Sequence, residues 1–269
     1  MPLFHLILVA LIQGITEFLP VSSSGHLVLL PMLSGYEDQG LAIDIAAHVG
    51  TLFAVVLYFW SDVRLALGGF GRMLRGKIDT QGAWLALCLT IATVPVMVVG
   101  LIFKLTGLAD ALRSAEVIAW TMILFGVLLY VADQRASLTR TQAQLSLNDA
   151  LKLGLWQAVA LVPGTSRSGV TITGALMLGY TREDGARIAM LMSIPTIIAS
   201  GILAGADAIG SDVALRDVSI VIGLSFVAAL AALSLMMRLL KTVSFTPYVI
   251  YRLLVGVALL MLVYSGALS

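Results

Sequence analysis

Three ionisable residues, Glu17, His26 and Arg167, stand in stretches of the sequence that are otherwise strongly apolar. An ionisable side chain inside a membrane costs about 2.5–3.5 kcal/mol, so such residues mark functional sites. Two short polar runs accompany them, 22–26 (SSSGH) and 164–169 (GTSRSG). A carboxylate, an imidazole, a guanidinium and several hydroxyls are the groups needed to bind a phosphate and to transfer it.

Each of these groups has an expected role. The Arg167 guanidinium can contact phosphate oxygens through two parallel hydrogen bonds. Ser23 or His26 could attack phosphorus, and the sequence leaves this choice open. Glu17 is the candidate general base and the candidate ligand of a metal ion. Each Ser-Gly loop opens a short helix, whose free N–H groups favour an anion and whose glycine permits close approach. The expected substrate-binding residues are Gln13, Ser22, Ser24, Gly25, Ser166, Ser168 and Gly169.

Structural roles compete with these interpretations. Glu17 and Arg167 could form an ion pair that only fixes packing, and His26 could only cap a helix. Ser22 and Ser168 could be small residues that let helices approach.

Two further ionisable residues favour structural interpretations. His48 follows Asp44 by four residues, which predicts a structural pair on one helix face. Arg252 follows Pro247 near a predicted span end, where we expect its side chain to extend toward the cytoplasmic boundary.

The composition indicates that lipid is the main solvent. Hydrophobic residues make up 59% of the 269 residues and charged residues 12%, whereas soluble domains average about 25% charged. The net charge of +1 and the absence of basic arrays with aromatics argue against nucleic acid as a partner. Six segments are long and apolar enough to span a membrane: about 42–61, 83–103, 115–132, 185–205, 218–237 and 247–267.

Two other apolar segments, 3–36 and 147–180, are interrupted by the polar runs and by prolines. In each, the first apolar piece of about 15 residues would span only ~22 Å of a ~30 Å membrane core. We therefore predict two re-entrant helical hairpins with their loops near mid-membrane, where protein or a water-filled cavity must surround the irregular backbone.

The two hairpins resemble each other at a constant offset of 144 residues. The identical positions are Leu11/Leu155, Gln13/Gln157, Ser22/Ser166, Ser24/Ser168, Gly25/Gly169, Gly35/Gly179 and Tyr36/Tyr180. Three predicted spans follow each hairpin, so the single membrane domain 1–269 divides into repeats 1–133 and 147–268. Because three is odd, the second repeat is inverted, and this predicts a site near the midplane where the broken helices meet.

The arginines and lysines predict the orientation. Segment 62–82 carries four of them, and alternation of the spans places 133–146, 181–184 and 238–246 on the same side. Cytoplasmic loops are enriched in Lys and Arg, so this side is expected to be the cytoplasm. The hairpin 3–36 would then enter from outside and 147–180 from the cytoplasm, so that their tips can meet.

The two polar runs carry a family resemblance. Residues 13–26, QGITEFLPVSSSGH, resemble the first signature of the bacterial undecaprenyl-pyrophosphate phosphatases, the bacitracin-resistance family. Residues 163–169, PGTSRSG, resemble that family's second signature. The resemblance extends over the whole chain in length, hairpin spacing and number of spans.

The resemblance implies hydrolysis of undecaprenyl pyrophosphate to the monophosphate at the outer face of the bacterial inner membrane. It implies a divalent cation, Mg²⁺ or Ca²⁺, membrane lipids as surroundings, and is compatible with a homodimer. Glu17 matches the family's acidic residue, Ser23 its proposed nucleophile, His26 its catalytic histidine and Arg167 its phosphate-binding arginine. Gln13 stands where many members carry a second glutamate, so Glu17 would act without a partner carboxylate.

Two other functions compete. A prenyl-phosphate carrier could use the same inverted repeat, but a carrier does not need the serine, histidine and arginine chemistry. The type-2 phosphatidic-acid phosphatases have Ser-Gly-His and Ser-Arg pairs, but they also need an Arg-Pro dipeptide, which this sequence lacks, and a histidine where it has Thr173. A purely structural membrane protein would have no reason to place charges at mid-membrane.

Overall fold

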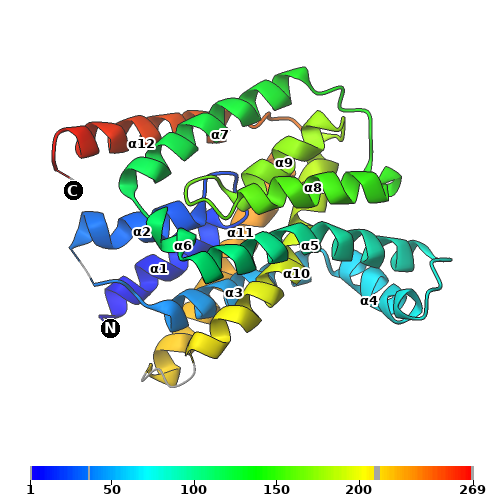
Figure 1. Cartoon of the computed structure of the whole chain (residues 1–269), viewed down its shortest axis with the longest axis horizontal. Helices are drawn as coiled ribbons and strands as arrows, with labels where there is room; N and C mark the ends of the chain where they lie inside the picture. The colour runs from blue at the N-terminus through cyan, green and yellow to red at the C-terminus, as the bar shows by residue number, and fades with distance from the viewer. Residues whose placement is uncertain (1, 36, 209–212, 268–269) are drawn as a thin grey trace.

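The structure is a computed structural model that describes residues 2–35, 37–208 and 213–267. Helices dominate these residues (Figure 1). In chain order they are α1 (Leu3–Thr16), α2 (Ser23–Ser34), α3 (Leu41–Tyr58), α4 (Trp60–Leu74), α5 (Gln81–Thr106), α6 (Leu108–Ala111), α7 (Ala115–Arg135), the 3₁₀ turn η1 (Gln142–Gln144), α8 (Leu147–Val159), α9 (Arg167–Met177), α10 (Arg182–Ala208), α11 (Leu215–Leu239) and α12 (Thr246–Tyr264).

Within the described ranges, six helices are long and apolar enough to cross a membrane. They are α3, α5, α7, α10, α11 and α12, which coincide with the six predicted spans. The protein is therefore an all-helical integral membrane protein.

Helix α4 was not expected, because segment 62–82 was interpreted as a cytoplasmic connection from its basic residues. The helix is amphipathic. Arg64 is exposed, whereas Asp62 is buried and pairs with Arg187 of α10 at 2.7 Å. A Cβ atom on Gly69 would lie 2.0 Å from the Gly82 backbone, so glycine lets α4 pack directly against α5.

Two pairs of short helices, α1–α2 and α8–α9, surround the polar runs. Their members have 14, 12, 13 and 11 residues, too few for any one of them to span a membrane core. A proline follows the first helix of each pair, Pro20 after α1 and Pro163 after α8, and disfavours helical backbone at the residue before it. Residue Tyr36, the predicted end of the first hairpin, lies outside the described residues.

Helix α8 begins in a polar cluster around Asp149. Arg140 contacts its carboxylate at 2.6 Å, and the Ser146 and Tyr180 hydroxyls donate to it at 2.7 and 3.0 Å. Burial opposes ionisation of this carboxyl, but these hydrogen bonds outweigh burial and lower the pKa of Asp149 to about 2. The cluster thus fixes the start of α8 on the side of the molecule where α4 lies (Figure 1).

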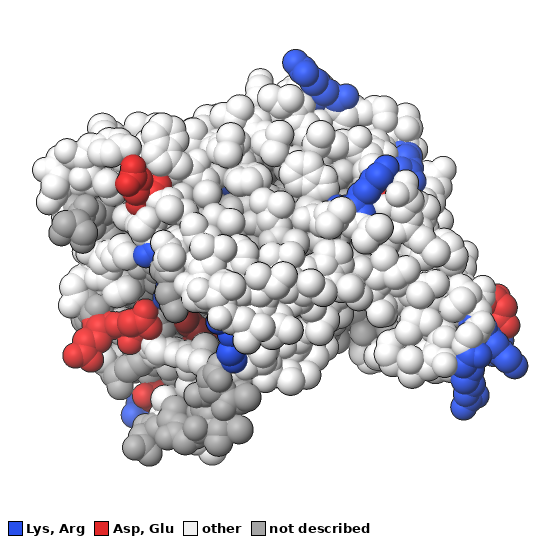
Figure 2. Space-filling view, viewed as in Figure 1, with Lys and Arg blue, Asp and Glu red and all other residues white. Residues whose placement is uncertain are grey.

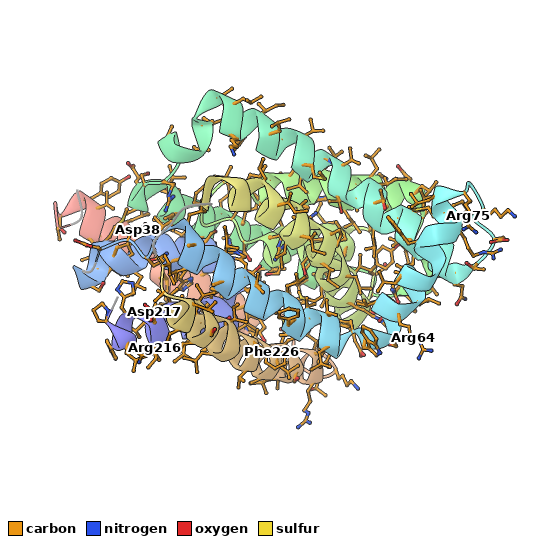
Figure 3. The ribbon with its side chains drawn as sticks, turned by 90° about the horizontal axis from the view of Figure 1, so that it is seen from below. Asp38, Arg64, Arg75, Arg216, Asp217 and Phe226 are labelled. Atoms are coloured by element: carbon orange, nitrogen blue, oxygen red, sulfur yellow. The ribbon has the colours of Figure 1, made fainter. Side chains whose placement is uncertain are left out.

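On the face shown in Figure 2, most charged side chains lie toward the left and right ends of the molecule, with a broad apolar belt between them. Arg64 and Arg75 lie at one end, and Asp38, Arg216 and Asp217 at the other (Figure 3). The beginning of α1 and the end of α12 are at the second end (Figure 1). This is the distribution expected of a bundle whose long axis crosses a membrane.

Candidate active site

The two polar loops have the same local structure. Ser22 and Ser166 precede α2 and α9 with φ angles of 76° and 72°, in the left-handed region that non-glycine residues rarely adopt. The hydroxyl of Ser22 accepts from the Gly25 N–H at 3.3 Å, and that of Ser166 accepts from the Gly169 N–H at 3.1 Å. Both serines therefore cap the helix that follows.

The loops contact each other near the centre of the bundle. The hydroxyl of Ser168 donates to the Leu19 carbonyl at 2.9 Å. A Cβ atom on Gly25 would lie 3.4 Å from the Cα of Gly164, so the two backbones pass closely. The structure thus brings together the two runs that lie far apart in the sequence.

Glu17 lies where the two loops contact each other, and its side chain is buried, with the residue 7% exposed. One carboxylate oxygen pairs with the Arg167 guanidinium. The other oxygen accepts from the Ser23 hydroxyl at 2.5 Å and from the Gln13 amide at 2.9 Å. The Nε2 atom of His48 lies 3.9 Å from the same oxygen. A carboxylate that accepts a serine proton in this way can activate that serine.

Arg167 begins α9 and keeps part of its guanidinium accessible. Besides Glu17, it contacts the Ser193 carbonyl at 3.3 Å, and its side chain is 18% exposed. A guanidinium has five N–H donors. These two contacts leave donors for a phosphate.

His26 lies on α2, three residues beyond Ser23. Its Nδ1 is 2.6 Å from the Ser22 carbonyl oxygen, and its Nε2 is 2.6 Å from the Tyr251 hydroxyl of α12. The His26 and Tyr251 rings stack with centroids 5.7 Å apart. The sequence does not predict a role for Tyr251.

The prediction for Arg252 was wrong. This residue does not extend to a boundary but is fully buried, with 0% exposure. Its guanidinium donates to backbone carbonyls at 3.0–3.3 Å. The acceptors are those of Pro20, Thr121, Met122, Gly164 and Thr165. Helix α12 begins at Thr246, so Arg252 lies in its second turn and not at its end. At that position the side chain faces α7 and the carbonyls of both loops.

The partner predicted for His48 is only partly correct. Its Nδ1 contacts the Asp44 backbone carbonyl at 2.8 Å, whereas the Asp44 carboxylate accepts from Gln39. The opposite ring nitrogen faces Glu17, so His48 belongs to the site. His48 also lines a groove of about 520 Å³ between α3 and α10, whose walls are mainly aliphatic.

The remaining predicted residues lie at the loops with different accessibility. Ser24 is exposed, and its hydroxyl is 3.4 Å from that of Ser22. Ser166 and Ser168 are buried, with hydroxyls 3.2 Å apart. A Cβ atom on Gly169 would lie 2.9 Å from the Arg252 guanidinium, so glycine is needed there for packing.

The site can supply oxygen ligands for a divalent cation. Among the described residues, no group of three or more His, Cys, Asp and Glu side chains could enclose a metal. Mg²⁺, however, is usually held by one or two carboxylates together with substrate phosphates. Glu17 offers a carboxylate, and the Gln13 Oε1 atom is buried without a hydrogen-bond partner among the described residues. These two groups fit such a cation.

Of the two residues whose place in the site the sequence does not predict, only one carries a recognisable sign in the sequence. Arg252 is a charge within a predicted span, which alone marks it for attention. Tyr251 is its neighbour but carries no signal of its own, because tyrosine is common in membrane helices near their ends.

Known proteins are similar to this sequence over nearly its whole length. The family model described as bacitracin resistance protein BacA matches residues 6–258. Proteins named undecaprenyl-diphosphatase from Dinoroseobacter shibae and Ruegeria pomeroyi are each 66% identical over 267 residues, covering 98% of this chain and 100% of theirs. One of the same name from Saccharophagus degradans is 45% identical over 265 residues, covering 98% of this chain and 99% of its own. The chain therefore belongs to the bacitracin resistance protein BacA family.

Proposed function

We propose that this protein hydrolyses undecaprenyl pyrophosphate to undecaprenyl phosphate and inorganic phosphate. The observation that carries the proposal is the contact of the Ser23 hydroxyl with Glu17 at 2.5 Å, beside the Arg167 guanidinium. Ser23 would be the nucleophile, Glu17 the base and Arg167 the phosphate ligand, and Glu17 contacts both of the other side chains in the interior of the bundle. The names of the relatives support the same reaction. Its product is the lipid carrier that cell-wall synthesis reuses. A role in bacitracin resistance agrees with the description of the family.

The mechanism uses Ser23 as the nucleophile. Glu17 takes the hydroxyl proton while the Ser23 oxygen forms a bond to the terminal phosphorus. The bond from this phosphorus to the bridging oxygen breaks, and undecaprenyl phosphate leaves. Water then attacks the phosphoserine and gives a proton to His26, while the bond from phosphorus to the Ser23 oxygen breaks and Glu17 returns its proton to that oxygen. Inorganic phosphate then leaves. Arg167 neutralises the oxygens in both steps, where positioning and charge supply most of the catalysis. His26, on the same helix face as Ser23, is the second proton-handling group.

A divalent cation would be held by Glu17, Gln13 and the phosphate oxygens of the substrate. When bound, it would neutralise the charge that develops on the transferred phosphoryl group.

The broken helices support a topology proposal. We infer that 3–36 and 147–180 are re-entrant hairpins of two inverted repeats, 1–133 and 147–268, within one membrane domain. The matching serine caps of the two loops support the repeat. The end of the molecule that carries Arg64 and Arg75 (Figure 3) would face the cytoplasm of a bacterial inner membrane. The site would open to the outer face.

The groove between α3 and α10 offers a place for the prenyl chain. Ile45 and Val49 of α3 face Ile198 and Ile202 of α10 across it, and His48 at its wall lies beside Glu17. A lipid tail in this groove would bring the pyrophosphate to Ser23 while the chain stays in an apolar environment.

The test is phosphate release from undecaprenyl pyrophosphate by the purified full-length protein in detergent, with and without a chelator. General-base and nucleophilic catalysis are worth about 10²–10⁴-fold, so Glu17→Gln and Ser23→Ala should each reduce kcat by at least that range. Glu116→Gln, an exposed carboxylate that contacts Tyr264, is the matched control and should leave kcat unchanged.

Normal turnover by Glu17→Gln would show that Glu17 is neither base nor metal ligand. If the wild-type protein releases no phosphate but moves prenyl phosphates across vesicles, the carrier function replaces the hydrolase.

A further inference from the structure

We propose that Tyr251 is a positioning residue of this site, whose hydroxyl holds His26 neutral with its proton on Nδ1 and its Nε2 lone pair covered. The effect on catalysis rests on the proposed phosphatase function. The state of the imidazole does not, because it follows from contacts within the protein.

The first step concerns Nδ1 of His26. Its contact at 2.6 Å is the Ser22 carbonyl oxygen, which also accepts from the His26 backbone N–H at 3.3 Å. A carbonyl oxygen can only accept, so Nδ1 must carry a hydrogen. The chain conformation at Ser22 thus selects the Nδ1–H form of the ring.

The second step concerns Nε2. In a neutral imidazole with Nδ1–H, Nε2 is an acceptor. The Tyr251 hydroxyl, 2.6 Å away, must then donate to it. A doubly protonated ring would add a cation beside the turn of α12 that already carries the buried guanidinium of Arg252, because Nε2 contacts its neighbour Tyr251. Low-dielectric surroundings disfavour a second charge there.

The third step concerns how Tyr251 is placed. Its neighbour Arg252 binds carbonyls of both loops, including those of Pro20 and Thr165. These bonds fix the second turn of α12 relative to the loop before α2, the helix that carries His26. The Tyr251 and His26 rings also stack, with an angle of 11° between their planes. The phenol is therefore held by its backbone and by its ring, not only by the hydrogen bond.

The consequence is a ring that can take up a proton without moving. When Nε2 gains a proton from the water that attacks the phosphoserine, the hydrogen bond reverses: Nε2–H donates, the Tyr251 oxygen accepts, and the phenol hydrogen turns to another acceptor. Tyr251 is 41% exposed, so an incoming headgroup or water can supply that acceptor. The reversal keeps His26 in register with Ser23 through both steps of the reaction.

The experiment is ¹⁵N NMR of the full-length protein in detergent with labelled histidine, combined with phosphate-release kinetics. The chain has three histidines, and loss of a signal in His26→Gln assigns His26. We expect a protonated Nδ1 and a bare, hydrogen-bonded Nε2. Tyr251→Phe keeps the ring and removes the hydroxyl. It should shift the Nε2 signal toward that of a nitrogen without a donor, and lower kcat about five- to tenfold with little change in KM. Tyr248→Phe on the same helix is the control and should change neither.

Three results would overturn the inference: a proton on Nε2 alone, an imidazolium at neutral pH, or an unchanged Nε2 signal in Tyr251→Phe. A changed signal with unchanged kcat would refute the role in catalysis. If the wild-type protein releases no phosphate, the proposed function fails, while the NMR result still decides whether Tyr251 sets the state of His26.

Discussion

Replacing Arg252 by leucine should destabilise the whole bundle. The guanidinium is 0% exposed and donates to five carbonyls. Those of Thr121 and Met122 lie within α7, but those of Pro20, Gly164 and Thr165 belong to the polar loops. Each buried carbonyl left without a donor costs about 1–3 kcal/mol. Such costs are not additive, so for the three loop carbonyls we expect a total loss of about 3–5 kcal/mol, the lower part of the summed range.

That loss corresponds to a fall in melting temperature of about 6–20 °C, since 1 kcal/mol shifts a chain of this size by about 2–4 °C. Arg252→Lys should give a smaller fall, because one ammonium group cannot reach carbonyls in two loops and in α7. Cys88 is buried and is the single cysteine of the chain. Its reaction with a thiol-sensitive dye during heating in detergent therefore reports opening of the bundle.

Arg64→Leu removes an exposed arginine of α4 and is the matched control. It should melt within about 2 °C of the wild type, because surface substitutions change stability little. If Arg252→Leu melts together with this control, the carbonyl network contributes no stability, and the reasoning from unsatisfied carbonyls is wrong.

Three other outcomes follow. Arg167→Lys should lose at least tenfold in kcat, because an ammonium group lacks the two-pronged contact with phosphate, and near-normal phosphate release would leave Arg167 only a charge or packing role. The pKa of Asp149, about 2, lies below its ordinary value of 3.8, so its carboxylate stabilises the fold fully above pH ~4 by about 2 kcal/mol. This stability should be lost as pH falls toward 2, and the gap in melting temperature between wild type and Asp149→Asn should narrow in parallel; a gap independent of pH would contradict it. In a Cys88→Ala background within intact cells, a membrane-impermeant thiol reagent should label Asp38→Cys but label Arg75→Cys only after permeabilisation, and labelling of both would refute the proposed orientation.

Most of the fold could be predicted because hydropathy decides it. Each span is a long apolar run between charged or polar segments. The two broken helix pairs are indicated by Pro20, by Pro163 and by the serines that follow these prolines. Helix α4 was missed because its basic residues suggested a loop, although the helix carries them on its exposed side. A count of charges by segment does not register that periodicity.

The site was predictable to the extent that its residues are chemically unusual. Glu17 and Arg167 are charges in apolar surroundings, and the structure pairs them. The partners of Arg252 could not be predicted, because they are backbone carbonyls of the irregular loops and of α7, and every residue of any sequence has a carbonyl. The contact between His48 and Glu17 could not be predicted either, because the Nε2 atom of His48 comes near Glu17 only through the packing of α3 against α1.

The separation of Glu17 and Arg167 by 150 residues has a consequence for biosynthesis. At about 5–20 residues per second, Glu17 leaves the ribosome roughly 8–30 s before its partner exists. During that interval the carboxyl group must stay hydrated or carry a proton, because an isolated carboxylate is too costly in the membrane core. Arg252, which connects the two loops, is made later still. The nascent chain therefore cannot complete this candidate site until α12 is inserted, and a truncation before α12 would leave the earlier helices around a site that lacks the Arg252 contacts.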